Sequence, residues 1–485
     1  MDVITDLMLG FGTAITPLNL MYCLAGVFLG TLIGVLPGLG PVATIAMLLP
    51  ATFGLPPVSA LIMLAGIYYG AQYGGSTTAI LINLPGESSS LVTALDGYAM
   101  ARKGRAGVAL ATAAIGSFFA GTVATLLIAL AAPPLAEIAL KFGPPEYFSL
   151  MVLGLLASVV LAHGPLLKAI GMIVLGLLLG LVGTDPNAAV QRFTLGVPEL
   201  SDGLNFVAVA MGMFGLGEII KNLENESDRS ALVGKLANMM PTREDWKRIV
   251  GPIVRGTVVG SVLGILPGGG AILSSFAAYS LEKKISPRSA EFGKGAIEGV
   301  AAPESANNAG AQTSFIPMLT LGIPSNPVMA LMIGALIIHG VQPGPSVMTE
   351  QPALFWGLIV SMWIGNLLLI ILNLPLVGLW ARMLMIPYHI LFPGIMVFCA
   401  VGVFSLNNTP FDLYVMVVFG LLGYILIKLN CELAPMLLGF ILGPMMEEYL
   451  HRPISAALLV LAAVALCLVL FPWFRRTRAA AFAED

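Results

Sequence analysis

The sequence predicts an all-α polytopic membrane protein built from two inverted structural repeats. Three observations support that fold class. Of the 485 residues, 58% are hydrophobic and only 10% are charged, whereas a soluble domain is about 25% charged. Apolar stretches near the ~20 residues that cross a bilayer recur along the whole chain. A segment rich in glycine and proline near the N-terminus is repeated in the middle of the chain.

The clearest apolar stretches lie at 18–36, 107–132, 167–183, 355–374 and 454–471. From their lengths we expect about 11 crossings and two hairpins that do not cross. The chain contains 55 glycines and 33 prolines, which break helices and are tolerated in a membrane only beside protein or a polar cavity. The N-terminus carries Asp2 and Asp6 but no basic region, so a cleaved signal peptide is not expected.

The repeated segment reads GTLIGVLPGLG at 30–40 and GSVLGILPGGG at 260–270. A second, looser match joins LINLPGESSS at 81–90 to TLGIPSNPVM at 320–329. Matches of this kind in the same order indicate an internal duplication.

Each half is expected to contain one re-entrant helical hairpin and one broken helix. The hairpins turn around 37–40 and 267–270, and the broken helices lie around 74–90 and 307–327. The arms of the hairpins, 24–36 with 41–53 and 253–266 with 271–281, are expected to be too short to span a bilayer.

The basic residues indicate how the halves are oriented, because cytoplasmic loops retain Lys and Arg. Nearly all of the 23 Lys and Arg fall in alternate loops. This pattern predicts that ARKGR at 101–105 is cytoplasmic, whereas its counterpart QPGPSVMTE at 342–350 is periplasmic. The two halves therefore point in opposite directions, an arrangement that suits alternating access. The expected division is 1–220 for the first repeat, 221–250 for a cytoplasmic linker, 251–448 for the second repeat, and 449–485 for an extra helix with a basic tail.

Spaced glycines such as Gly30 with Gly34 and Gly260 with Gly264 are typical of close helix packing. The PGLG and PGGG turns differ, because they free backbone groups at membrane depth, where an unsatisfied group costs several kcal/mol. Those groups need a partner, which could be a helix, water, an ion or a substrate.

Several long motifs together resemble the large membrane subunit, of the TctA type, of the tripartite tricarboxylate transporter family. They are the two LPGxG hairpins, YYGAQYGGSTTAILINLPGE at 68–87, ALDGYAMARKGRAGVAL at 94–110, PESANNAGAQTSFIPMLTLGIP at 303–324, VQPGPSVM at 341–348 and CELAPMLLGFILGPMMEE at 431–448. The resemblance covers nearly the whole chain. It departs from the family pattern at Gln312 and Thr313, where small residues are expected.

The resemblance implies an electrochemically driven importer of citrate and other carboxylates in the bacterial inner membrane. It implies symport with a cation, sodium or a proton, and two partners: a small four-helix membrane subunit and a soluble periplasmic binding protein. It implies no ATPase module, and the sequence contains no GxxxxGK[ST] loop. No catalytic residue, bound metal or other cofactor is expected.

A carboxylate substrate needs hydrogen-bond donors, and Lys and Arg are almost absent at mid-membrane. The remaining donors are Ser, Thr and Asn side chains and the N-termini of broken helices, where the dipole contributes about half a positive charge. The alternative is that these polar residues only satisfy one another between helices. The candidate substrate-binding residues are Pro37, Gly38, Gly40, Gly74, Gly75, Ser76, Thr77, Asn83, Pro267, Gly268, Gly269, Gly270, Asn307, Asn308, Gln312, Thr313, Pro324 and Ser325.

Acids at membrane depth are candidate cation ligands, because carboxylate oxygens suit hard cations. Glu304 is the first choice, whereas Glu87 and Asp96 are expected to be interfacial and solvated. The four histidines lie near segment ends without metal-ligand spacing, and proton relay by one of them is the minor alternative. The four cysteines are scattered through apolar segments and are interpreted as packing residues.

Three other functions are open to such a chain. A channel could also use glycine turns, but duplicated broken helices favour a carrier. A large subunit of the TRAP type, or another ion-coupled anion transporter, could share inverted hairpins. A membrane enzyme would need a concentrated constellation of His, Asp, Glu or Ser, and none is evident.

Nucleic acid is not an expected partner, because no basic tract with interleaved aromatics occurs.

Overall fold

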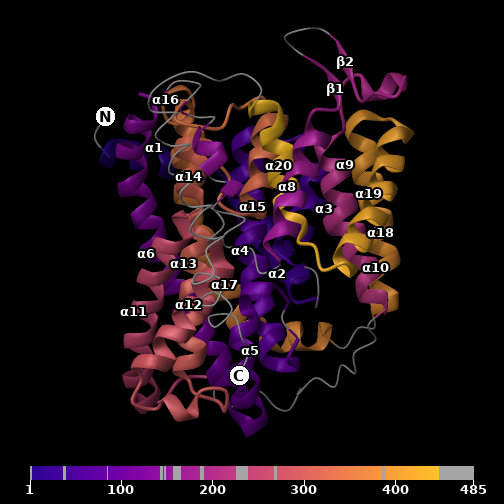
Figure 1. Ribbon diagram of the computed structural model, residues 1–485. Coiled ribbons are helices and arrows are strands. Elements are labelled where there is room, and N and C mark those ends of the chain that lie inside the picture. Colours follow the sequence, from indigo (N-terminus) through magenta and orange to yellow (C-terminus); the bar gives the residue numbers. More distant parts are fainter. Residues whose placement is uncertain are drawn as a thin grey trace.

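The computed structural model describes residues 3–36, 40–84, 86–142, 146, 149–153, 155–156, 165–185, 190–224, 239–266, 270–384 and 388–446. In this part of the chain the protein is mainly helical (Figure 1). The helices up to residue 224 are α1 (Val3–Ala14), α2 (Pro17–Gly34), α3 (Pro41–Leu48), α4 (Pro57–Ile82), α5 (Leu91–Met100), α6 (Ala106–Ala139), α8 (Leu166–Gly180), α9 (Phe206–Ala210) and α10 (Gly217–Glu224).

The later helices are α11 (Arg243–Ile265), α12 (Gly270–Ile285), α13 (Glu298–Thr313), α14 (Phe315–Leu321), α15 (Pro327–Ile338), α16 (Ser346–Glu350), α17 (Pro352–Met383), α18 (Tyr388–Asn407), α19 (Pro410–Lys428) and α20 (Leu433–Met446). Tight turns of helix lie at η1 (Leu49–Thr52), η2 (Ser88–Ser90), η4 (Pro198–Leu200) and η6 (Ser289–Glu291), and wide turns at η3 (Ala101–Arg105) and η5 (Met211–Leu216). A two-stranded antiparallel ribbon joins β1 (Gly183–Thr184) to β2 (Gln191–Arg192), with Gly183 opposite Arg192.

Within the described residues, five helical stretches are long and apolar enough to cross a membrane. They are Pro17–Gly34, Ser88–Ala139, Arg243–Ile265, Pro352–Met383 and Pro410–Lys428. The prediction of a helical, multi-pass membrane protein is confirmed. The helix expected in 449–485 lies outside the described residues, and the expected domain boundaries stay a prediction.

Local sequence signals account for many helix ends. Proline occupies the first turn of α2, α3, α4, α15, α17 and α19, where its missing N–H costs nothing. α11 begins at a capping box, in which Thr242 and Asp245 exchange hydrogen bonds. At the other end of helices, α4 stops at Asn83 with φ 56° and α14 stops at Gly322 with φ 68°.

The first arm of each expected hairpin is longer than the sequence suggested. α2 has 18 residues and α11 has 23, so both reach spanning length. The expectation of short first arms was wrong, because α11 extends into the polar segment that its capping box starts, where hydropathy gives no signal. The turns at 37–39 and 267–269 lie outside the described residues.

Glycine brings α2 against α4 and α11 against α13. A Cβ on Gly30 would lie 2.3 Å from the carbonyl oxygen of Ile67, and one on Gly260 would lie 2.2 Å from that of Ala306. Neither helix pair leaves room for a side chain there, so the interpretation of the spaced glycines as close-packing positions is confirmed.

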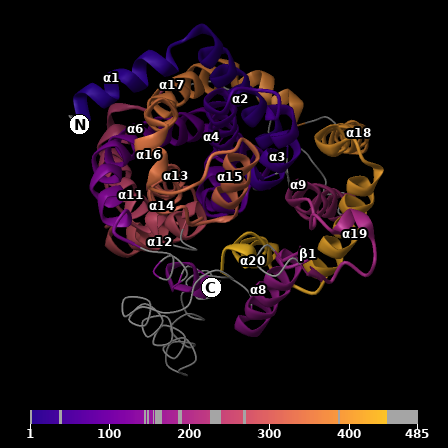
Figure 2. The same cartoon turned by 90° about the horizontal axis from the view of Figure 1, so that it is seen from above.

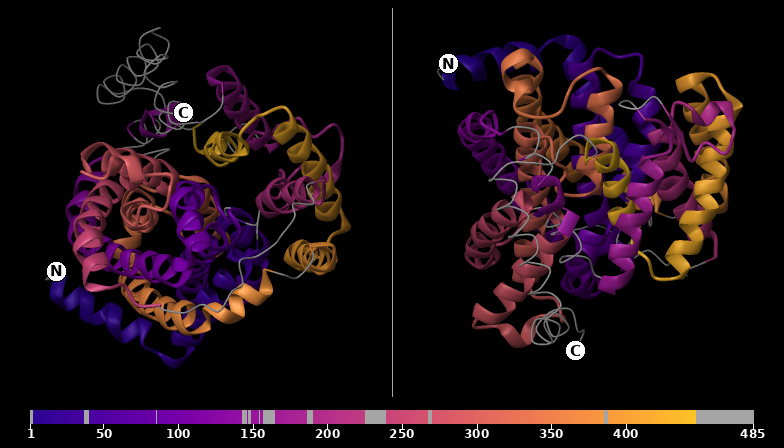
Figure 3. Two further views of the ribbon diagram at one scale, coloured as in Figure 1. Left: turned by 90° about the horizontal axis from the view of Figure 1, so that it is seen from below. Right: turned by 45° about the horizontal axis from the view of Figure 1, so that its top comes forward.

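Seen from above, α2, α4, α6, α11–α15 and α17 form a rounded body, with α1 along its outside (Figure 2). An arc made of α8, α9, α18, α19 and α20 stands beside it, and α3 lies between the body and the arc. The same division is seen from below (Figure 3). Within the arc α8 packs against α20, and α19 packs against α9 and η5.

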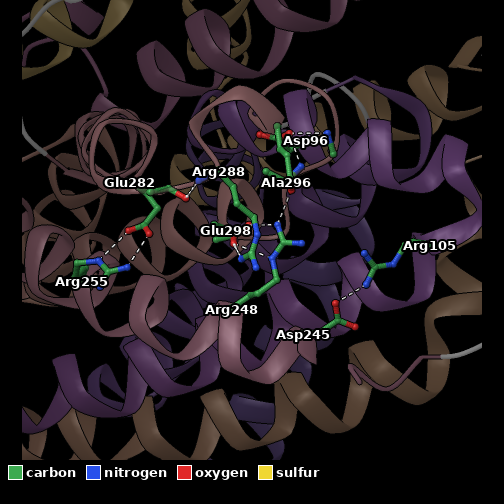
Figure 4. A network of polar contacts seen from close by, with 12 residues as sticks. Asp96, Arg105, Asp245, Arg248, Arg255, Glu282, Arg288, Ala296 and Glu298 are labelled. Carbon is green, nitrogen blue, oxygen red and sulfur yellow. Dashed lines mark hydrogen bonds and ion pairs between the residues drawn. The ribbon is translucent and has the colours of Figure 1, made fainter. Parts of the chain in front are cut away.

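The segments predicted to be cytoplasmic meet at one end of the molecule. Arg105 pairs with Asp245 at 2.6 Å, Arg248 with Glu298 at 2.7 Å, and Arg255 with Glu282 at 2.7 Å (Figure 4). Lys103 donates to the carbonyl oxygen of Lys294 at 2.5 Å. α1 and α16 lie at the opposite end (Figure 1). The basic segments and α16 thus lie at different ends of the molecule, and the side of the membrane that each end faces stays a prediction.

Candidate functional site

A buried carboxylate joins the two halves of the chain. Glu304, within α13, is 0% exposed and accepts hydrogen bonds from Ser76 Oγ of α4 and Thr93 Oγ1 of α5, both at 2.5 Å. Asn307 Nδ2 lies 3.4 Å away. No salt bridge in the described part of the chain includes Glu304. Its charge is therefore surrounded by neutral donors.

The polar residues next to Glu304 largely satisfy one another. Asn308 Nδ2 lies 2.7 Å from Ser117 Oγ of α6, 2.6 Å from Asn307 Oδ1 and 3.1 Å from the carbonyl oxygen of Glu304. Thr125 Oγ1 lies 3.5 Å from Gln312 Oε1. The contact of Asn308 with Ser117 is mutual satisfaction between helices, the alternative that the sequence left open, whereas its other two partners lie in α13 itself.

A separate cavity of about 790 Å³ lies between the two halves. Gly40, Gln72 and Glu87 line it from the first half, and Ala271 and Asn326 from the second. The cavity reaches Lys221 of α10 and the connection between α19 and α20. It therefore meets the ends of both hairpin turns and both helix breaks.

Glu87 is held on the wall of this cavity. Its side chain is 7% exposed, and Ser89 Oγ lies 2.5 Å from its Oε1. Gly75 makes room for it, because a Cβ there would lie 2.6 Å from Glu87 Cγ. The expectation that Glu87 is solvated was wrong, because the chain folds back over α4 directly after the break that follows Ile82.

Asp96 is likewise buried, at 0% exposure, so that expectation was also wrong. It accepts hydrogen bonds from Tyr279 Oη at 2.9 Å and from the backbone N–H groups of Gly295 at 2.7 Å and Ala296 at 2.8 Å. Figure 4 shows it beside the segment that leads into α13. The donors come from a part of the chain about 200 residues later, which local sequence cannot show.

The predicted residues divide into several groups. Pro37, Gly38, Pro267, Gly268 and Gly269 lie outside the described residues, and Gly40 lines the cavity. Gly270 has φ 53°, and a Cβ on it would lie 3.2 Å from Asn326 Cβ. Asn83 is the residue at which α4 ends. Ser325, which follows Pro324 in the chain, donates a hydrogen bond from Oγ to the carbonyl oxygen of Ser314 at 3.3 Å.

The other predicted donors lie inside continuous helix. Gly74, Gly75, Ser76 and Thr77 belong to α4, and the segment 307–313 belongs to α13. Both segments are interrupted within the expected ranges, 74–90 and 307–327, but these donors lie before the interruptions, because close packing against α2 and α11 stabilises helix there despite their poor propensity. Among the described residues of these two segments, helix is interrupted at Asn83, Leu84, Gly86 and Glu87, at the single residue Ser314, and at 322–326. Backbone N–H donors are consequently not free at Gly74–Thr77, and only the side chains are available.

Sequence reasoning missed Thr93, Gln72 and Ser89. Thr93 donates to Glu304, and Gln72 Oε1 lies 3.0 Å from Ser89 Oγ beside Glu87. The signal that could have found Gln72 was its place in YYGAQYGG, as a polar residue one helical turn before Ser76.

Comparison with known proteins decides the family. Residues 20–438 match the model of the "Tripartite tricarboxylate transporter TctA family". The chain belongs to the TctA family. It is thus a membrane component of a tricarboxylate transporter and not an enzyme.

Two proteins of Agrobacterium vitis are similar to this TctA protein. The "Uncharacterized 52.8 kDa protein in TAR-I ttuC' 3'region" is 62% identical over 500 residues, which cover 100% of each chain. The "Uncharacterized protein in TAR-II ttuC' 3'region" is 60% identical over 241 residues, 47% of this chain and 100% of that protein. No solved structure matches the TctA chain.

Proposed function

We propose that this TctA protein is the translocating subunit of a secondary transporter that imports small di- and tricarboxylates by cation symport. The cavity between the halves is its substrate site, and the buried Glu304 is its cation site. The observation that carries the proposal is that one cavity meets Gly40, Glu87, Ala271 and Asn326, residues from both hairpins and both helix breaks. Substrate sites of inverted-repeat carriers lie at such places.

Correspondence between the halves supports an inverted repeat. Gly26, Gly30 and Gly34 approach Met63, Ile67 and Ala71, and Gly256, Gly260 and Gly264 approach Ala302, Ala306 and Gly310 at the same spacings. Each of these partner helices leads to a residue with positive φ, Asn83 or Gly322, two positions before a proline. On this correspondence Glu87 and Asn326 occupy equivalent places. Alternating access then follows from two similar units of opposite orientation.

The cavity offers neutral donors for a carboxylate. The side-chain amide nitrogen of Asn326 has no hydrogen-bond partner in the described part of the chain. Ser88, Ser89, Tyr68 and Gln72 also line the cavity. A multiply charged anion is strongly unfavourable in such a site unless its charge is offset, and a cation that enters with it supplies the offset.

Glu304 supports the cation site. Its carboxylate and the hydroxyl oxygens of Ser76 and Thr93 are oxygen ligands of the kind that hard cations take. The cluster contacts α4, α5 and α13, so a cation bound there would tie the two halves together.

The orientation follows from charge. The end with Arg105, Arg248 and Lys428 is assigned to the cytoplasm, and the end with α1 and α16 to the periplasm. A periplasmic binding protein would then deliver substrate at the α16 end, and a small four-helix subunit would accompany the chain in the bacterial inner membrane.

The test is uptake by proteoliposomes that contain this chain and its co-purified membrane partner. Labelled citrate and succinate are offered with the binding protein, under a sodium gradient or a pH gradient. Saturable uptake that depends on one of these gradients, together with counterflow, is expected. Non-saturating flux without counterflow would indicate a channel instead.

A further inference from the structure

Glu87 is a carboxylate on the wall of the same cavity in which the proposed function places an anionic substrate. Glu87 forms no salt bridge within the described residues. The other charged residues on the cavity wall are Lys221 of α10 and Glu432 of the connection between α19 and α20. Tyr68 of α4 and Cys431 of the same connection are the uncharged titratable groups there. An ionised Glu87 therefore repels an anionic substrate in the same cavity.

We infer that Glu87 is the coupling residue of this transporter: a small monovalent cation, Na⁺ or a proton, must neutralise it before a carboxylate substrate binds. This inference rests on the proposed function for its substrate. It assigns to Glu87 a role different from that of Glu304, because Glu304 is sealed between helices and Glu87 faces the cavity.

The hydrogen bonds around Glu87 suit both of its charge states. Ser89 Oγ lies 2.5 Å from Glu87 Oε1 and 3.0 Å from Gln72 Oε1. When Glu87 is ionised, the Ser89 hydroxyl donates to the carboxylate. When Glu87 is protonated, it donates to Ser89, and the Ser89 hydroxyl turns to Gln72 Oε1. If Na⁺ binds instead, the same three oxygens face it as ligands.

Gln72 also links this site to Glu304. Ser76 Oγ lies 3.2 Å from the backbone carbonyl oxygen of Gln72 and 2.5 Å from Glu304 Oε2. Glu87 thus reaches the side chain of Gln72 through Ser89, and Glu304 reaches the backbone carbonyl of Gln72 through Ser76, which lies one helical turn further along α4. Occupation of the two carboxylates by cations is expected to be linked through this turn.

Coupling between two sites typically changes affinity about 5- to 150-fold. We therefore expect the affinity of the wild-type chain for citrate to rise at least tenfold when Na⁺ is added or when the pH is lowered. A factor of this size lies within the range that such coupling gives. In Glu87→Gln the affinity for citrate without added cation should be higher than that of the wild type, and its rise with Na⁺ or acid should be smaller, because only the Glu304 site still responds to cations.

The experiment measures thermal stability of the purified full-length chain, because a ligand that binds the native state raises the melting temperature. Citrate is titrated with Na⁺ or choline at fixed pH, and then across pH without Na⁺, which separates the two cations. Glu350→Gln, an exposed carboxylate on α16, is the matched control and should keep the wild-type cation dependence. A Glu87→Gln chain that keeps the wild-type dependence overturns the inference.

Two further measurements separate the inference from the proposed function. Without citrate, Na⁺ or acid should stabilise the wild type more than Glu87→Gln, and equal stabilisation overturns the inference. If neither the wild type nor Glu87→Gln binds any carboxylate, the proposed function is contradicted. The stabilisation by Na⁺ or acid without citrate then still tests whether Glu87 binds the cation. If Glu87→Gln does not fold, the wild-type chain is labelled with a carbodiimide instead, and mass spectrometry measures how much of Glu87 has reacted. Labelling that neither Na⁺ nor pH changes would overturn the inference.

Discussion

Ser76 Oγ of α4 lies 2.5 Å from Glu304 Oε2 of α13, so a hydroxyl of the first half donates to a fully buried carboxylate of the second. Hydrogen bonds to an ionised group are stronger than those between neutral groups. This contact therefore binds the halves together at the point where the proposed cation site lies.

Ser76→Ala removes one donor from Glu304 and leaves the carboxylate less satisfied. We expect a loss of about 1 to 3 kcal/mol in stability or in the binding of the coupling cation. Thr77→Ala is the matched control, because among the described residues Thr77 Oγ1 donates only to the carbonyl oxygen of Tyr73 in its own helix, at 3.3 Å. Unfolding in denaturant and cation titration of uptake measure the two effects. Equal behaviour of the two variants would show that the Ser76 contact has no special role.

Glu304→Gln removes the charge but keeps the size of the side chain. The concentration of cation that gives half-maximal uptake should rise about tenfold or more, since a hydrogen bond to a charged group contributes about 1.5 to 3 kcal/mol. The KM for substrate at saturating cation should change much less. Uptake kinetics at several Na⁺ concentrations and pH values provide the measurement. A change confined to the substrate KM would contradict the cation role.

The sequence predicted the features that repeat or that have a local signal. Apolar length predicted spanning stretches such as Pro17–Gly34 and Pro352–Met383 but not Arg243–Ile265, and glycine spacing predicted the close packing seen at Gly30. It did not predict that Gly74–Thr77 are helical, because packing against α2 overrides the weak propensity of these residues. Nor did it predict that Asp96 is buried, because the donors at Tyr279, Gly295 and Ala296 reach it only in the folded chain.

Gly260→Ala should destabilise the protein, because its new Cβ would lie 2.2 Å from the carbonyl oxygen of Ala306 and α11 must move away from α13. We expect a cost of about 1 to 3 kcal/mol for this overpacking. Gly378→Ala on α17 is the control, because no atom lies within 4 Å of its new Cβ, and alanine is the better helix former by about 1 kcal/mol. Thermal unfolding in the same detergent compares them. A Gly260→Ala chain as stable as Gly378→Ala would refute the close packing.

Single cysteines test the orientation of the two ends. Arg102→Cys in η3 and Thr349→Cys in α16 place exposed thiols at opposite ends of the molecule. In intact cells whose native cysteines have been replaced, an impermeant maleimide should label position 349 but not position 102. After the cells are opened, both positions should react. Equal labelling of both from outside would contradict the inverted repeat.

The glycines that follow the two hairpin turns should respond differently to substitution, although they occupy equivalent places in the repeat. Gly270 has φ 53°, where an L side chain is strained, and its Cβ would lie 3.2 Å from Asn326 Cβ. Gly40 has φ −70°, and its Cβ would lie 3.9 Å from Glu87 Cβ, which is ordinary contact. Gly270→Ala therefore costs about 1 kcal/mol or more in backbone strain and displaces Asn326, whereas Gly40→Ala adds only a methyl group to the cavity wall.

We expect Gly270→Ala to reduce citrate uptake at least tenfold, while its amount in the membrane stays normal. A tenfold change corresponds to about 1.4 kcal/mol. Gly40→Ala should retain uptake within about threefold of wild type. Bulkier changes in the turns, Gly38→Val and Gly268→Val, should abolish uptake in both halves, because a β-branched side chain blocks approach to the backbone. Transport assays matched for protein amount distinguish these cases. Normal uptake by Gly270→Ala would mean that Asn326 does not need its present position, and the neutral-donor site would have to be sought elsewhere on the cavity wall.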